Sequence, residues 1–233
     1  MTRRLILLSI AAIALLGACS DDHDDEDGSQ QSATAPAPAA SRWSSSAVWD
    51  YYGAAVPTTV EGACKRSPPM VQPGDPCVID AMRNAGASTR AIDFYEAKGY
   101  FLASFQEQGR IDYGQGGAFW INMGRPTPQL FLNGSPDIIE ATIPDDYKTD
   151  PTYADVIRPV DRGSGVITGA FPWLEYGRLA SSTAEPNGGQ RLVIEYPLRA
   201  CRACPDLGYL PVAYGFDAQG RLGSTQTLPL RKP

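Results

Sequence analysis

Four cysteines could form disulfides, exchange thiols or bind a metal in the folded part of this chain. They are Cys64, Cys77, Cys201 and Cys204, and a fifth, Cys19, stands near the N-terminus. If the chain is exported, as the N-terminal residues discussed below indicate, an even number of cysteines predicts two disulfides. We expect the pairs Cys64–Cys77 and Cys201–Cys204.

The spacing Cys201-Arg202-Ala203-Cys204 is also typical of redox-active thiols, whose pKa is lowered by neighbouring arginines and a helix N-terminus. Pro205-Asp206-Leu207-Gly208 follows directly and predicts a turn where such a site needs a helix. We therefore favour a structural disulfide and keep a thiol-disulfide protein as an alternative. A zinc site built from all four cysteines is a third interpretation, disfavoured by an oxidising compartment and by the wide spacing of Cys64 and Cys77. No metal or cofactor is predicted.

Histidine chemistry is excluded from the folded part of the chain, because His23 is the only histidine and lies in the N-terminal tail. Ser-His-Asp triads, Cys-His pairs and His-ligated zinc are excluded with it. A carboxylate pair of the glycosidase type remains, with its two groups about 5–10 Å apart. The carboxylates on or near predicted strands are Asp112, Glu140, Glu195 and Asp217. Nothing in their spacing selects a pair, so we predict no catalytic residue and keep a glycan hydrolase as an alternative.

Aromatic residues offer candidates for binding a sugar or a protein. Trp173 and Tyr176 stand in the segment Phe171-Pro172-Trp173-Leu174-Glu175-Tyr176, within a region rich in Pro and Gly. Such a loop favours a surface position, where aromatic rings stack on ligands or anchor a partner. Trp120 is a further candidate, although its strand-like surroundings favour packing in the core.

The first residues have the three parts of a secretory signal. Arg3 and Arg4 precede an apolar run, Leu5–Leu16, which is too short to span a bilayer core of about 30 Å. The run ends in Leu16-Gly17-Ala18-Cys19, which resembles the lipobox of bacterial lipoproteins. The resemblance covers about the first twenty residues. It implies cleavage before Cys19, acylation of Cys19 and stable attachment to a membrane through lipid. Ser20, in the position after the lipidated cysteine, implies the outer membrane rather than the inner one.

An acidic tail separates the secretory signal from the globular domain. The chain has 26 acidic and 20 basic residues, and six of the acids stand between Asp21 and Asp27. Ala and Pro dominate the stretch that follows, as far as Ala40. Such a segment cannot bury apolar surface and is predicted to be a disordered tether. We therefore expect a signal peptide at 1–18, a lipidated tether at 19–41 and one globular domain at 42–233.

The sequence of this domain predicts an α+β fold, made mainly of antiparallel sheet with two short N-terminal helices. Asp75-Pro76 and Ser88 are expected to begin the helices, and Gly86 and Gly99 to end them. Long loops are expected between Pro144 and Asn187. The expected strands are Tyr100–Gln108, Ala118–Met123, Gln129–Leu132, Ile138–Ile143, Arg191–Leu198, Tyr209–Phe216 and Arg221–Leu230.

These features predict a non-catalytic binding domain, tethered by lipid and facing the periplasm or the cell surface. A tether gives reach, and the domain lacks a recognised catalytic spacing. The expected partners are the membrane, through Cys19, and an envelope protein or glycan. Nucleic acid is not expected, because no basic patch with interleaved aromatics is visible in the sequence.

Replacing Cys19 with Ala tests the lipobox. The variant should remain uncut and carry no acyl chains, because the cysteine is both the processing signal and the site of acylation. Mass spectrometry of the N-terminal peptide, with membrane fractionation, measures both. Normal maturation and membrane retention of the variant would contradict the prediction.

Overall fold

The computed structural model describes residues 42–49, 64, 75–118, 127–157, 160–161, 166–167 and 169–233. All of them belong to one compact unit, Ser41–Pro233. Among these residues, no helix combines the length and apolar character needed to cross a bilayer. The expected signal peptide, Cys19, the tether and Trp120 lie outside the described residues.

Two helices near the start of the unit have the boundaries that their end residues predict. α2 (Pro76–Asn84) begins after Asp75, whose side chain accepts a hydrogen bond from the Cys77 amide. α3 (Thr89–Lys98) begins after Ser88, which accepts from the Ala91 amide, and it ends at Gly99. Gly99 has φ 75°, a conformation that glycine adopts without strain. A short 3-10 helix, η1 (Ser45–Ala47), precedes them.

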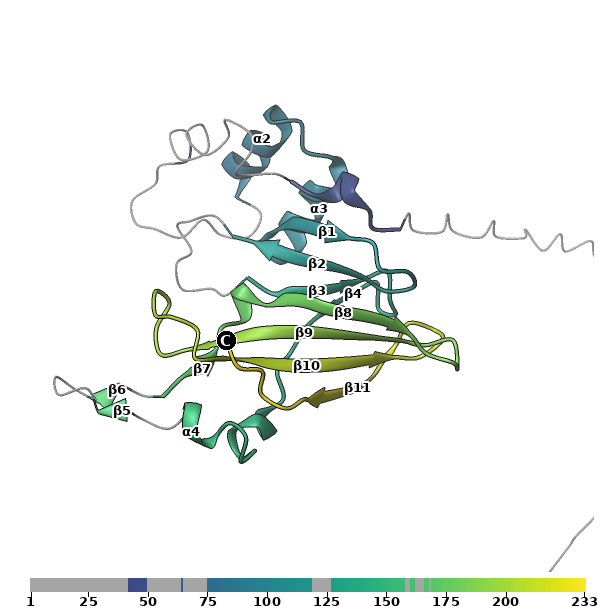
Figure 1. The fold of residues 1–233 in the computed structure, drawn as a ribbon. Helices are drawn as coiled ribbons and strands as arrows, with labels where there is room; N and C mark the ends of the chain where they lie inside the picture. The colour runs from purple at the N-terminus through teal and green to yellow at the C-terminus, as the bar shows by residue number, and fades with distance from the viewer. Residues whose placement is uncertain are drawn as a thin grey trace, which may run out of the picture. The chain divides into compact units, whose positions relative to one another are not determined.

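Sheet A has four antiparallel strands in the order β1-β2-β3-β4. Figure 1 shows these strands next to α2 and α3. One face of the sheet carries Leu102, Leu130 and Leu132, which pack with Trp43 and Phe94. The strands are β1 (Phe101–Gln106), β2 (Asp112–Gly117), β3 (Gln129–Leu132) and β4 (Ile138–Glu140).

Sheet C is also antiparallel and contains the C-terminal half of the described chain. Its order is β11-β10-β9-β7, and β8 also pairs with β9. The strands are β7 (Phe171–Pro172), β8 (Arg178–Ala184), β9 (Gln190–Arg199), β10 (Gly208–Phe216) and β11 (Leu222–Thr227). The remaining elements are η3 (Asp145–Lys148), α4 (Ala154–Ile157), β5 (Val160–Asp161), β6 (Val166–Ile167) and η4 (Leu174–Tyr176). The α+β prediction is therefore confirmed.

The two large sheets share one core. Even-numbered side chains of β9 and β10, such as Ile194 and Val212, pack there with Tyr113 and Phe131 from sheet A. Because side chains alternate along a strand, the odd-numbered residues of β9 and β10 lie on the opposite face. We call this opposite face the outer face of sheet C, and it carries the surface described below.

Three expectations about strands need correction. The segment expected to form long loops contains strand β8, whose small and polar residues alternate only weakly because most of them are exposed. The strand expected at Ala118–Met123 does not include Ala118, which follows β2 and is not in a strand, and its other residues lie outside the described part of the chain. The strand expected at Ile138–Ile143 is shorter in the structure, where it ends at Glu140.

Glycines in β2 explain why the sequence did not indicate that strand. A Cβ atom at Gly117 would lie 2.3 Å from the Phe101 ring, and one at Gly114 would lie 2.8 Å from Leu102. The large side chains of β1 therefore occupy the space that branched residues of β2 would fill. The large apolar residues of this part of the sheet therefore stand on β1 and not on β2.

A buried glutamine joins the two sheets. Gln190 is 3% exposed, and its side chain accepts a hydrogen bond from the Ile111 amide at 2.8 Å. Its amide group donates to the carbonyl oxygens of Gln108 and Ile111, both at 3.0 Å, and to Ser182. The side chain thus satisfies backbone groups just before β2 that no neighbouring strand reaches.

Replacing Gln190 with Ala should lower the free energy of unfolding by about 1–3 kcal/mol, because buried backbone groups of Ile111 lose their partner. Urea unfolding of the disulfide-intact protein measures the change. Gln226 on β11 is exposed, so Gln226→Ala is the matched control and should shift stability by no more than about 0.5 kcal/mol. Equal effects of the two substitutions would contradict this role of Gln190.

Candidate interaction surface

The four carboxylates expected to be candidates for acid–base chemistry do not form a pair around a shared partner. Within the described part of the chain, each binds cations of its own. The partners are Arg42 for Asp112, Lys98 for Glu140, Arg178 and Arg231 for Glu195, and Arg221 for Asp217. Asp112 also accepts from the Gln108 and Gly109 amides, which gives it a role in the turn before β2. The backbone of Arg221 lowers the pKa of Asp217, the opposite of what a general acid needs.

The cysteines form the two expected pairs, Cys64–Cys77 and Cys201–Cys204, so the disulfide prediction is confirmed. Cys201–Cys204 closes a turn in which the Cys204 amide donates to the Cys201 carbonyl at 3.0 Å. β10 follows at Gly208, and no helix stands between them. The arrangement lacks the helix N-terminus that lowers the pKa of a redox-active cysteine. Among the described residues, no group of three or more His, Cys, Asp or Glu side chains could hold a metal ion.

Exposed apolar side chains gather beside this disulfide. Phe171, Tyr176 and Leu207 are 42%, 39% and 38% exposed, and they are the exposed large hydrophobic residues of the described chain. Phe171 stacks on Trp173, with 5.1 Å between ring centroids and 27° between planes, and Trp173 lies 6.3 Å from Tyr176. The two aromatic residues singled out in the loop are therefore brought together, and Phe171 joins them.

Arginines surround these rings on the same outer face of sheet C. Arg199 packs over Tyr176, with 4.7 Å from guanidinium carbon to ring centroid, while Arg178 and Arg231 pack over Tyr209 at 4.9 and 4.3 Å. Such cation–π contacts orient the guanidinium groups. We call the whole group the aromatic–arginine patch. Its members are Phe171, Trp173, Tyr176, Arg178, Arg199, Arg202, Leu207, Tyr209 and Arg231.

Glu195 supports one half of the patch from below. Its side chain is 11% exposed and accepts two hydrogen bonds from Arg231, at 2.5 and 3.0 Å, and one from Arg178 at 3.2 Å. Strand register brings Glu195 into contact with both arginines. Arg178 lies opposite Glu195 on the neighbouring strand, and the Tyr209–Arg231 bridge places the C-terminal segment alongside β10. Glu195 is therefore an ion-paired structural carboxylate.

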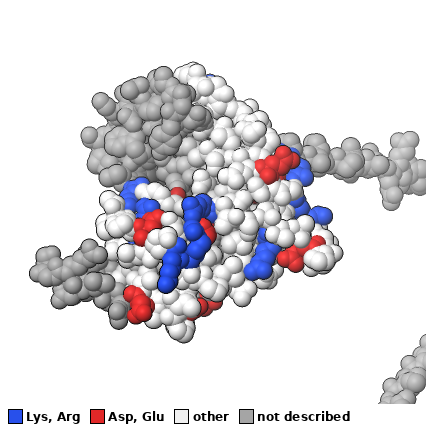
Figure 2. Space-filling model, in the orientation of Figure 1, with Lys and Arg blue, Asp and Glu red and all other residues white. Residues whose placement is uncertain are grey.

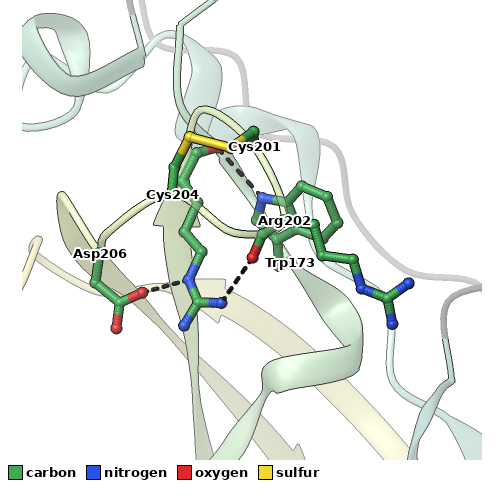
Figure 3. Close-up of a disulfide and its surroundings, with 6 residues drawn as sticks. Trp173, Cys201, Arg202, Cys204 and Asp206 are labelled. Carbon is green, nitrogen blue, oxygen red and sulfur yellow. Dashed lines mark hydrogen bonds and ion pairs between the residues drawn. A yellow bond between two sulfur atoms is a disulfide. The ribbon is translucent and has the colours of Figure 1, made fainter.

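Asp206 supports the other half, next to the disulfide. It binds the Arg199 guanidinium, which lowers the pKa of the carboxyl, and it accepts a hydrogen bond from Tyr209 at 2.8 Å. That hydrogen bond in turn raises the pKa of Tyr209. Arg199 also donates to the Arg202 carbonyl in the turn. Figure 3 shows Trp173 and Arg202 beside Cys201–Cys204, with Asp206 across the loop.

The aromatic loop is held in place by sheet A. Gln129 is fully buried and donates to the Leu174 carbonyl at 2.8 Å, and Gln115 donates to the Gly177 carbonyl at the same distance. On the other side, the Trp173 amide donates to Pro197 at 3.0 Å and its indole N–H donates to Arg199. These hydrogen bonds hold the backbone on both sides of the loop and thereby position the rings.

A shallow groove of about 380 Å³ lies on the same outer face, at the far ends of β9, β10 and β11. Arg191, Gly215 and Ser224 line it, and they are register neighbours across the three strands. Glu185 and Asp217 line it too, so its charge is mixed. About six residues of β10 separate Tyr209 from Gly215, or roughly 20 Å at the rise of a strand.

Sequence reasoning singled out Trp173, Tyr176 and Glu195, and it considered arginines only as neighbours of the Cys201–Cys204 thiols and not as binding residues. Arg178 and Arg231 gain their positions from strand pairing that no local pattern indicates. Comparison with protein families, curated proteins and solved structures finds no match to this chain.

Proposed function

We propose that this protein is a lipid-anchored envelope lipoprotein whose globular domain binds another component of the envelope without catalysing a reaction. The lipobox residues ending at Cys19 support the anchor, and Ser20 favours the outer membrane. The observation that supports binding is the aromatic–arginine patch, where the exposed large hydrophobic residues of the described chain meet four arginines.

The chemistry of the patch fits recognition better than catalysis. Exposed aromatic rings and arginines are the residue types that contribute most binding energy at interfaces. Its carboxylates lie in ion pairs with these arginines and leave no acid poised to donate a proton. The loop carrying the rings is fixed by hydrogen bonds, which reduces the entropy lost when a partner binds.

A photo-crosslinking amino acid at Tyr176, in the native host, tests the proposal. It should capture an envelope component, seen as one or a few discrete adducts by mass spectrometry. The same probe at Gln219, exposed in the β10–β11 turn, is the control and should not give these adducts. The Tyr176 adducts should also disappear when Arg178 is replaced with Gln.

Two outcomes would contradict the proposal. One is the same set of adducts from both positions, which would show that the patch has no special role. The other is cleavage of peptidoglycan by the purified protein, abolished by replacing a single carboxylate, which would establish the hydrolase alternative.

A further inference from the structure

We infer that the ligand of the aromatic–arginine patch is an anionic polysaccharide. Its acidic groups would bind the guanidinium groups, and its sugar rings would lie against Phe171 and Tyr176. The inference rests on the proposed function and names the chemistry of the partner. Three features of the patch support this inference. They are the greater exposure of its arginines than of their carboxylate partners, its exposed aromatic rings and its small apolar area.

Three of the four arginines of the patch are more exposed than the carboxylates that pair with them, whereas Arg199 and Asp206 are equally exposed. The side chains of Arg178, Arg202 and Arg231 are 57%, 51% and 46% exposed. The carboxylates that pair with them, Glu195 and Glu175, are only 11% and 14% exposed. On the face seen in Figure 2, Asp and Glu side chains lie between and beside the Lys and Arg side chains, as the ion pairs require. A ligand approaching from solvent therefore meets guanidinium groups first.

Two of these guanidinium groups keep an edge available for a second anion. Arg178 and Arg231 both bind Glu195 through Nε and Nη2. No hydrogen bond or ion pair engages the Nη1 atom of either residue within the described ranges. A guanidinium group can bind one carboxylate along each of two edges, and paired N–H donors match the geometry of carboxylate, phosphate and sulfate oxygens. Glu195 holds both groups in place while their side chains remain 57% and 46% exposed.

Phe171 and Tyr176 keep 42% and 39% of their surface exposed next to those donors, although Phe171 stacks on Trp173 and Arg199 packs over Tyr176. Phe171 lies opposite Arg199 in the β7–β9 pairing, so ring and guanidinium share one face of the sheet. An aromatic face is electronegative and attracts the slightly positive C–H groups of a sugar ring. Alternation of ring faces with cationic groups matches a chain in which sugar rings carry acidic substituents.

The small apolar area argues against a large protein partner. Stable protein interfaces bury about 800 Å² on each side around an apolar centre. The patch has three large exposed apolar residues, Phe171, Tyr176 and Leu207, with arginines between them. An apolar area of this size suits a narrow ligand that lies along the outer face of sheet C. Such a ligand would gain affinity from ion pairs with the arginines as well as from apolar contact.

Binding of polygalacturonate to the mature, lipidated protein in nanodiscs tests the inference. The neutral probe is the fully methyl-esterified form of the same polymer, so the comparison isolates the carboxylates. Polygalacturonate should bind at least tenfold more tightly than the ester, and less tightly as salt rises. Dextran sulfate against dextran repeats the comparison with a different acidic group.

Variants identify the surface. Arg178→Gln and Tyr176→Ala should each weaken binding at least threefold, with thermal unfolding showing that the domain remains folded. Arg221→Gln removes the same charge from an exposed arginine in the distant β10–β11 turn, so it is the matched control and should leave affinity unchanged. Arg178→Lys keeps the charge, loses the fork of donors and should also weaken binding.

The outcomes separate this inference from the proposed function. Absence of binding to both anionic polymers, or binding unaffected by Arg178→Gln and Tyr176→Ala, overturns the anionic polysaccharide. If Tyr176 still crosslinks a protein in the host, the proposed function stands without this ligand. Equal binding of single-stranded DNA and polygalacturonate would show a general polyanion site and also contradict the inference. If Tyr176 crosslinks nothing in the host and neither anionic polymer binds, both the proposed function and this inference are wrong.

Discussion

The carboxylate of Glu195 holds together three parts of the chain that are distant in sequence. It lies on β9, between Arg178 at the start of β8 and Arg231 near the C-terminus, and both arginines pack over Tyr209. Because the carboxylate is largely buried, removing either cation would leave a poorly compensated negative charge beneath the surface. The position of each arginine on the outer face of sheet C is therefore set by the charge underneath. These two arginines are part of the fold and at the same time remain about half exposed to solvent.

The same arrangement recurs at the disulfide turn and in the aromatic loop. Asp206 fixes Arg199 as Glu195 fixes the other two arginines, and its lowered pKa keeps it ionised over a wide range of pH. Gln115 and Gln129 anchor the loop that carries the rings from the side of sheet A. A surface held in this way loses little freedom when it binds, so a modest number of contacts can give useful affinity. The consequence is a patch whose arginines and aromatic loop are each held by hydrogen bonds or ion pairs.

Local signals in the sequence predicted much of the fold. Asp75, Ser88 and Gly99 marked helix ends because capping depends on the residue itself, and the alternation in Tyr209–Phe216 marked β10 because one face of that strand is buried. Strands β2 and β8 were missed for opposite reasons. Glycines of β2 leave room for the large residues of β1, and small polar residues of β8 face solvent at an edge. The site was predicted only in part. Aromatic residues in a loop indicated a surface, but Arg178 and Arg231 owe their places to the β8–β9 pairing and to the Tyr209–Arg231 bridge, which are contacts between distant residues.

Amide hydrogen exchange of the unbound protein tests most directly whether the patch is built in advance. The informative amides are those of Trp173, Leu207 and Tyr209, which donate to Pro197, Leu198 and Arg231 at 3.0, 2.9 and 2.8 Å. A preformed patch predicts slow exchange at all three, approaching that of the centres of β9 and β10. It also predicts that Glu195→Gln speeds exchange at Tyr209 and leaves Trp173 unchanged, because different groups hold the two segments. Exchange of these amides in the wild-type protein at the rate of an unstructured peptide would contradict the account.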